Sequence, residues 1–135
     1  MATKEIKIYC DGGSRGNPGP SAAGVVITTT DDRVLAEYCE YLGIQTNNFA
    51  EYSAVLLALR NLNEYKDYRL KFYLDSQLVV RQLNGEYKVK NTNIKDLYEQ
   101  IISQIEDIQI SFEHVYREYN KLADAQVNRC LDDQI

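Results

Sequence analysis

The sequence predicts an α/β fold in which one five-stranded mixed sheet carries helices on both faces. Two observations predict it. The first 42 residues hold three strand-like segments joined by short turns, which favours an antiparallel meander. From residue 48 onward, helical periodicity alternates with short β-rich runs, which favours two parallel strands with right-handed crossovers. The expected order is βββ-α-β-α-α-β-α, in a single domain of residues 1–135.

The predicted meander comes first along the chain. Residues 4–11 alternate between apolar and polar side chains, as a half-buried strand does. Residues 22–30 are rich in small and β-branched side chains, and residues 34–42 follow after a turn at residues 30–32. Both prolines and four of the seven glycines lie between Gly12 and Pro20, so this stretch is predicted to be a loop.

The later elements alternate between helix and strand. Apolar residues follow helical spacing over residues 48–62, and Thr46, Asn47 or Asn48 would each cap this helix. The remaining predicted elements are a strand at 68–74, helices at 76–83 and 94–105, a strand at 108–116, and a last helix that Asn120 caps.

Composition narrows the class of protein. The net charge of −5 argues against a protein held on nucleic acid by bulk electrostatics. Residues 1–11 are too short and charged for a signal peptide, and the chain has no apolar run long enough to cross a membrane. Cys10, Cys39 and Cys130 lack the spacing of a zinc site or a disulfide framework. We therefore expect a cytoplasmic protein with reduced thiols, no membrane contact and a monomeric state.

Four acidic residues are predicted to meet at one edge of the sheet. Asp11 and Asp75 are expected to end strands, while Glu51 and Asp124 are expected in the first turns of helices. Strand carboxyl ends and the helix starts that follow them share the edge where ligands bind in such folds. For any one of these acids alone, a turn or a helix cap is the commoner role. Asp11 and Asp75 weaken that alternative, because both follow strongly β runs that should be central.

Four ionised carboxylates in close contact repel one another, and divalent cations remove this penalty. Oxygen ligands without histidine or cysteine suit Mg²⁺ or Mn²⁺ and make zinc a poor fit. Two such ions about 3.5–4 Å apart are an established device for cleaving phosphodiesters. The acids therefore predict a site for two Mg²⁺ ions, with Mn²⁺ as an alternative.

At four places the chain resembles ribonuclease HI. The residues that carry the resemblance are the run IYCDGGSRGNPGP at 8–20, the run TNNFAE at 46–51, the run DSQ at 75–77 and the run NKLAD at 120–124. They appear in order over nearly the whole chain, which makes a chance match very unlikely. The resemblance implies a ribonuclease H-like fold. It also implies an endonuclease that hydrolyses the RNA strand of RNA–DNA hybrids by two-metal-ion catalysis and leaves 5′-phosphate and 3′-hydroxyl ends.

The resemblance assigns roles to individual residues. As metal ligands and catalytic acids it implies Asp11, Glu51, Asp75 and Asp124. As substrate contacts it implies Gly12, Gly13, Ser14, Arg15, Asn17, Thr46, Asn47, Asn48, Ser76, Gln77, Arg81 and Arg117. Asparagine and glutamine amides suit 2′-hydroxyls and minor-groove base edges. Helix capping is an equally open role for Asn47 and Asn48, as is plain solvation for Arg81.

Two departures from the family pattern change the expectations. Many bacterial members carry a Gly-His loop before the last aspartate, whereas here the only histidine, His114, lies ten residues before Asp124. We expect a structural role for His114, and Arg117 is the better candidate for meeting the scissile phosphate. The basic protrusion of many members is also missing, with Lys88 and Lys90 as its remnant. Together with the net charge, this predicts either weak, salt-sensitive hybrid binding or binding that is helped by a partner.

Three other functions fit the sequence less well. A nucleic-acid-binding module without catalysis would be favoured if one of the four acids were missing. A phosphotransferase of the actin-like type would need two such domains and a longer chain, and the glycine-rich stretch lacks the lysine of a P-loop. A purely structural protein would suit the 11 tyrosines but leaves the ordered acids without a role.

Overall fold

The computed structural model describes residues 4–134, which form one five-stranded sheet with strand order β3-β2-β1-β4-β5. Residues 1–3 and 135, which the predicted domain includes, lie outside the described residues. The strands are β1 (Glu5–Ser14), β2 (Gly19–Thr28), β3 (Val34–Gln45), β4 (Arg69–Leu74) and β5 (Ile110–His114). The helices are α1 (Asn47–Arg60), α2 (Gln77–Leu83), α3 (Thr92–Ile105) and α4 (Lys121–Asp132).

The strand pairing confirms the predicted mixed sheet. β1 pairs with β2 and β2 with β3 in antiparallel fashion, as a meander does. β4 pairs with β1 and β5 with β4 in parallel fashion, and helices connect these strands. β1 is therefore central, with one antiparallel and one parallel neighbour.

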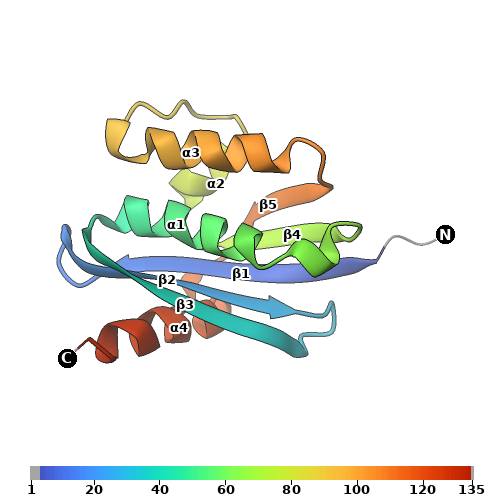
Figure 1. Ribbon diagram of the computed structural model, residues 1–135, viewed down its shortest axis with the longest axis horizontal. Coiled ribbons are helices and arrows are strands. Elements are labelled where there is room, and N and C mark those ends of the chain that lie inside the picture. Colours follow the sequence, from blue (N-terminus) through green and yellow to red (C-terminus); the bar gives the residue numbers. More distant parts are fainter. Residues whose placement is uncertain (1–3, 135) are drawn as a thin grey trace.

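The helices form two layers around the sheet. Figure 1 shows α1, α2 and α3 on one side and α4 alone on the other. The larger core lies between α1, α3 and the sheet, and its fully buried side chains include Ile8, Tyr52 and Phe72. A smaller apolar cluster holds α4 on the opposite face, where Val127 and Leu131 pack near Ala22. Both faces of β1 and β2 are therefore covered near their centres.

β1 is longer than predicted and changes the shape of the glycine-rich stretch. The predicted strand ended at Asp11, but β1 continues to Ser14, because residues 11–14 pair with residues 21–24 of β2. The expectation that a loop begins at Gly12 was therefore wrong. The turn is confined to residues 15–18, where the N–H of Arg15 donates to the carbonyl of Pro20.

Smaller differences affect other element ends. The strand predicted at 22–30 is shifted toward the N-terminus and is β2 (Gly19–Thr28), and the strand predicted at 108–116 is shortened to β5 (Ile110–His114). Helix α3 starts at Thr92, two residues before the predicted Ile94. Thr46 caps α1, since its hydroxyl accepts from the N–H of Phe49 at 3.2 Å. Asn120 precedes α4 as predicted, but its side chain makes no capping hydrogen bond.

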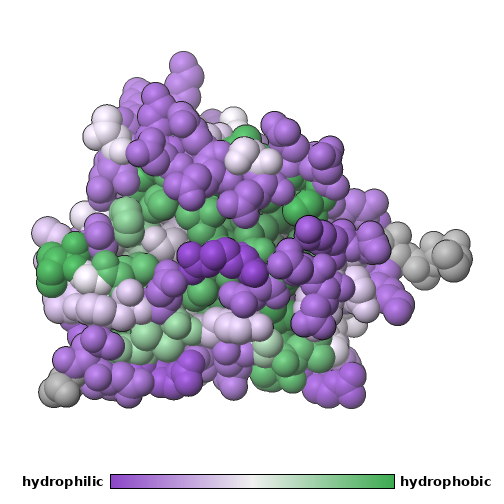
Figure 2. All heavy atoms as spheres, in the orientation of Figure 1, coloured by the Kyte–Doolittle hydropathy of each residue, from purple (hydrophilic) through white to green (hydrophobic). Residues whose placement is uncertain are grey.

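The surface of residues 4–134 is mixed. Figure 2 shows a largely polar face with apolar side chains at both ends of the edge strand β3. Val34 and Leu35 at one end of β3 and Ile44 near the other are exposed apolar residues, and Tyr41 is exposed as well. None of the helices in the described part of the chain has the length and apolarity to span a lipid bilayer. Cys10, Cys39 and Cys130 form no disulfide among the described residues.

Candidate metal centre

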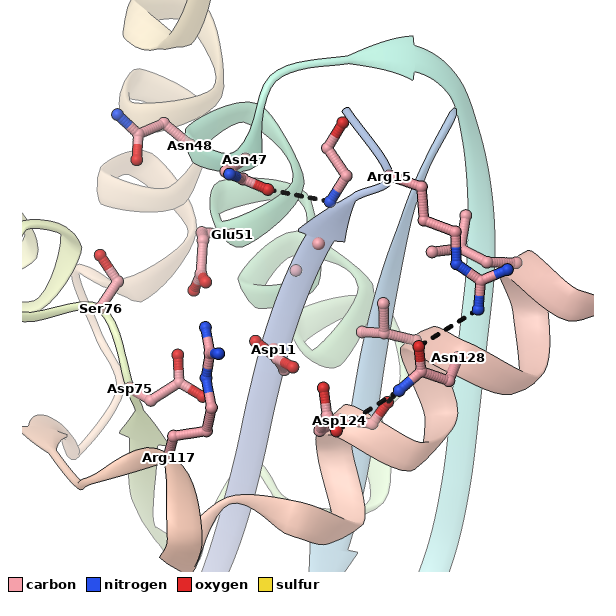
Figure 3. A pocket seen from close by; sticks show the side chains of 15 residues that line it. Asp11, Arg15, Asn47, Asn48, Glu51, Asp75, Ser76, Arg117, Asp124 and Asn128 are labelled. Atoms are coloured by element: carbon pink, nitrogen blue, oxygen red, sulfur yellow. Dashed lines mark hydrogen bonds between the residues drawn. The ribbon is translucent and has the colours of Figure 1, made fainter. Parts of the chain in front are cut away.

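The four predicted acids lie together, although they come from four distant parts of the chain. Asp11, Glu51 and Asp75 each offer a carboxylate oxygen, and these atoms lie within 4.8 Å of one another. Asp124 approaches Asp11 from α4, close enough for their carboxyl groups to share a hydrogen bond. Figure 3 shows Asp11 between Asp124 on one side and the pair of Glu51 and Asp75 on the other.

Strand register brings Asp75 to Asp11. Cys10 of β1 lies opposite Leu74 in the parallel ladder with β4, so the residues that follow them, Asp11 and Asp75, leave the ladder side by side. β4 ends there because Ser76 starts α2, with its hydroxyl accepting from the N–H of Val79 at 3.3 Å. Asp75 therefore lies directly after the last residue of β4 and not within the strand. Asp11 does not end its strand, because β2 continues to pair with β1 beyond it.

The absence of a side chain at Gly12 lets α1 bring Glu51 to the site. A Cβ atom at Gly12 would lie 2.1 Å from the carbonyl carbon of Ala50 and 2.3 Å from the backbone nitrogen of Glu51. Only glycine permits this close approach of helix and strand. The predicted first-turn position of Glu51 was wrong: α1 begins at Asn47, so Glu51 is its fifth residue and lies beyond the first turn. Its location therefore depends on packing against β1 and not on the helix dipole.

A second glycine contact positions Asp124 in the same way. A Cβ atom at Gly24 of β2 would lie 2.5 Å from the carbonyl oxygen of Ala123, so α4 lies directly on the strand. Gly24 is the antiparallel partner of Asp11. The first turn of α4, which contains Asp124 as predicted, is therefore held next to Asp11.

Burial and mutual repulsion disfavour the ionised forms of these acids. Asp11 and Glu51 are both only 7% exposed. Burial, followed by the charges of Asp75 and Asp124, raises the pKa of Asp11 to about 8. Burial and then the charges of Asp11 and Asp75 raise the pKa of Glu51 well above its usual value, while the positive charge of Arg117 opposes this.

The donor set fits a hard divalent cation. Glu51 Oε2 is buried and has no hydrogen-bond partner among residues 4–134, which is a costly state for a carboxylate oxygen. The converging ligand atoms are all carboxylate oxygens, and such ligands are typical of Mg²⁺ and Mn²⁺. A cation here would satisfy the unpaired oxygen and offset the repulsion that raises the pKa values.

The acids lie in an open polar cleft with a volume of about 480 Å³. The predicted substrate contacts that line it are Gly12, Gly13, Ser14, Arg15, Asn47, Asn48, Ser76 and Arg117. In Figure 3 the Arg117 guanidinium points toward Glu51 between Asp75 and Asp11. Asn47 joins the two sides of the cleft rim, because its Oδ1 accepts from the N–H of Ser14 at 2.9 Å.

Four of the predicted substrate contacts do not line this cleft. Thr46 is occupied as the cap of α1, and Asn17 Oδ1 accepts from the N–H of Asn47 at 3.0 Å. Arg81 lies over the ring of Tyr87 and donates to its hydroxyl at 3.2 Å. Gln77 is exposed at the start of α2. These side chains therefore lie outside the acidic cleft, and their first contacts are with the protein or with solvent.

His114 also lies outside the cleft. It ends β5 as an exposed residue, and its ring meets the ring of Tyr116 edge-on at 5.5 Å. The structure thus separates the histidine of this chain from the acids, whereas Arg117 lies among the residues that line the cleft.

Two further asparagines donate hydrogen bonds to the acids: Asn128, which lines the cleft and which no motif in the sequence singled out, and Asn120, which was expected only to cap the last helix. Asn128 Nδ2 donates to the Asp124 carboxylate at 3.4 Å, and its Oδ1 accepts from Arg15 at 3.3 Å. Asn120 Nδ2 donates to Asp75 Oδ2 at 3.1 Å. The spacing of four residues between Asp124 and Asn128 was a usable signal, because such residues share a helix face. No local pattern pointed from Asn120 to Asp75.

Comparisons with known proteins agree with this geometry. A family model described as "Reverse transcriptase-like" matches residues 9–130. The chain is 39% identical over 132 residues to the bifunctional protein Rv2228c of Mycobacterium tuberculosis, covering 95% of this chain and 36% of that protein. It is 38% identical over 134 residues to ribonuclease HI of Halobacterium salinarum, covering 95% of this chain and 65% of the relative. The chain thus spans about a third and about two thirds of these relatives.

The fold also matches that of a solved structure. The crystal structure of LC11-RNase H1 in complex with an RNA/DNA hybrid matches with a TM-score of 0.92 and 40% identity. The match covers 96% of this chain and 99% of that chain.

Proposed function

Since this chain belongs to the ribonuclease H family, we propose that it is an endonuclease that hydrolyses the RNA strand of RNA–DNA hybrids. Residues 1–135 act as one domain in this proposal, in keeping with the single sheet and the family match over residues 9–130. The products carry 5′-phosphate and 3′-hydroxyl ends, and the 2′-hydroxyl serves recognition. The LC11-RNase H1 complex with a hybrid supports the choice of substrate.

One observation carries the proposal. Buried or half-buried carboxylates from β1, from α1 and from the residue after β4 converge within 4.8 Å, with that of Asp124 beside them, in a cleft open to solvent. Stability alone disfavours such a cluster, because like charges and burial both raise its free energy. A cluster of acids with raised pKa values in an open cleft is typical of an active site.

Asp11, Glu51, Asp75 and Asp124 would hold two Mg²⁺ ions, or Mn²⁺ in their place. When bound, the ions supply a water of lowered pKa and neutralise charge on the departing oxygen. The carboxylates keep their position because their elements are packed together through Gly12 and Gly24. No movement of the backbone is then needed to assemble the site.

The other residues of the cleft bind and orient the hybrid in this proposal. Arg117 approaches the scissile phosphate, since its guanidinium points among the acids (Figure 3). Asn47 and Asn48 offer amide groups at the rim, suited to 2′-hydroxyls and base edges of the minor groove. Arg15 and Arg117 are the cationic side chains among the lining residues, so few phosphates are neutralised and binding is weak.

Cleavage of a labelled hybrid tests the proposal. We expect Mg²⁺-dependent cleavage of its RNA strand with 5′-phosphate products, slower or no cleavage of matched RNA and DNA duplexes, and hybrid binding without turnover in Ca²⁺. Asp75→Asn should remove activity, whereas Asp67→Asn should not, because it changes an exposed aspartate just before β4, at the opposite end of that strand from Asp75. Full turnover by Asp75→Asn, or cleavage in EDTA, would contradict the mechanism.

A further inference from the structure

Asn120 connects the elements that carry three of the four acids. It is only 1% exposed, at the junction between β5 and α4. Its Nδ2 donates to the carbonyl of Cys10 at 2.8 Å and to Asp75 Oδ2 at 3.1 Å. Its own carbonyl accepts the N–H of Asp124 at 3.1 Å. One residue therefore contacts β1 next to Asp11, the carboxylate that follows β4, and the first turn of α4.

Helix capping does not account for this arrangement. An asparagine before a helix normally accepts a backbone N–H of the first turn with its side-chain oxygen. The Asn120 side chain makes no such bond, and its Oδ1 is buried without a hydrogen-bond partner among residues 4–134. A half-satisfied buried amide costs stability. The side chain therefore does not cap α4, and both of its hydrogen bonds, to the Cys10 carbonyl and to Asp75, are made at the acid site.

The bond to Asp75 opposes electrostatic repulsion. Asp75 lies beside Asp11 and Glu51, and when these acids are ionised, as metal binding requires, their charges repel its carboxylate. A donor fixed by the Cys10 carbonyl holds one oxygen of Asp75 in place. A carboxylate has about four lone-pair sites, so this bond leaves others free for a cation. The amide therefore lowers the cost of keeping Asp75 in a position where it can bind one.

We propose that Asn120 is a positioning residue that holds the Asp75 carboxylate in its metal-binding orientation and fixes α4 against β1. The inference rests on the proposed function, because it assumes that the acids bind Mg²⁺. Outer hydrogen bonds of this kind orient ligands, and their loss usually costs about 10–100-fold in metal affinity or activity. We expect at least a tenfold loss of Mg²⁺ affinity when Asn120 is replaced.

Direct metal binding is the test, with MgCl₂ titrated into the metal-free protein by calorimetry and by the rise in melting temperature. Asn120→Ala removes the donor, and Asn120→Ser restores a good helix cap but is too short to bridge Cys10 and Asp75. Both variants should bind Mg²⁺ at least tenfold more weakly than the wild type. The matched control is Asn84→Ala, because Asn84 also lies at a helix end and its side-chain amide also donates to a strand carbonyl, that of Phe112, at 3.0 Å. It should lose stability and keep Mg²⁺ affinity.

A double-mutant cycle shows whether Asn120 acts through Asp75. If it does, Asn120→Ala combined with Asp75→Asn should bind Mg²⁺ no more weakly than Asp75→Asn alone. Wild-type affinity in Asn120→Ser, or equal losses in Asn120→Ala and Asn84→Ala, would overturn the proposal.

Cleavage assays on the same proteins separate this inference from the proposed function. A wild type that binds Mg²⁺ with Asn120-dependent affinity but cleaves no hybrid would contradict the function and support the positioning role. Cleavage by the wild type together with unchanged Mg²⁺ affinity in Asn120→Ser would support the proposed function and overturn the positioning role.

Discussion

Arg15 and Asp132 form an ion pair across the rim of the acidic cleft, with 2.7 Å between Arg15 Nη2 and Asp132 Oδ1. The same nitrogen of Arg15 also donates to Asn128, which in turn donates to Asp124. A cation that lines the cleft is therefore partly neutralised by an acid at the end of α4. Binding of a phosphate by Arg15 would have to compete with this pair.

Asp132→Asn should strengthen hybrid binding. Exposed ion pairs of this kind contribute about 0.2–1 kcal/mol, so we expect the Kd for hybrid to fall by about 1.4-fold to fivefold, with kcat unchanged. Binding is measured by fluorescence anisotropy in Ca²⁺ at low salt. Asp133→Asn is the matched control, because it makes the same change of net charge at the next residue. Equal effects of the two variants would show that net charge alone matters.

Glu51→Gln should separate stability from activity. The neutral amide cannot ionise, whereas burial and the neighbouring acids disfavour the charged form of Glu51 in the folded state, so the metal-free variant should gain free energy of unfolding at pH 8. The same change removes a ligand, so turnover and the stabilisation by Mg²⁺ should be lost. Urea unfolding and cleavage assays measure the two effects, with Glu99→Gln on the exposed surface of α3 as control. A loss of metal-free stability would contradict the electrostatic account.

The metal-free protein should become less stable as the pH rises from about 4 to about 8. Asp11 has a pKa of about 8 when folded, against 3.8 as an ordinary aspartate, so the folded state binds more protons over this range. The free energy of unfolding then falls with rising pH. Urea unfolding in EDTA at several pH values measures this, and Asp11→Asn should flatten the profile. Mg²⁺ should stabilise the protein more at pH 8 than at pH 5, since protons compete with the metal.

Gly12→Ala should destabilise the fold and impair the site together. The new Cβ would overlap the backbone of Ala50 and Glu51 at 2.1–2.3 Å, so α1 has to move away from β1. We expect a loss of about 3 kcal/mol, at the upper end of overpacking costs, and weaker Mg²⁺ binding because Glu51 moves. Gly13→Ala is the control, since its Cβ would meet only a Val127 methyl at 3.2 Å. Similar melting temperatures for the two variants would contradict this account of the packing.

Much of the fold followed from local patterns. Alternation in residues 4–11 and the turn at residues 30–32 specified neighbouring antiparallel strands, because side-chain period and turn chemistry act over a few residues. The β1 boundary did not follow, since its last residues become strand by pairing with residues 21–24. Similarly, three residues offered a cap for α1, and the structure selects Thr46, while Asn47 is bonded to Ser14.

The sequence by itself determined the order of the elements and which four acids meet, because hydrophobic period and element order decide which residues reach one edge of a sheet. The tertiary structure alone decided how these acids are held. Helix α1 approaches β1 at Gly12, α4 approaches β2 at Gly24, and Asn120 turns from its helix toward Asp75. These are contacts between residues distant in the chain. They depend on how backbones pack and on where buried hydrogen bonds find partners, and no short stretch of sequence records either.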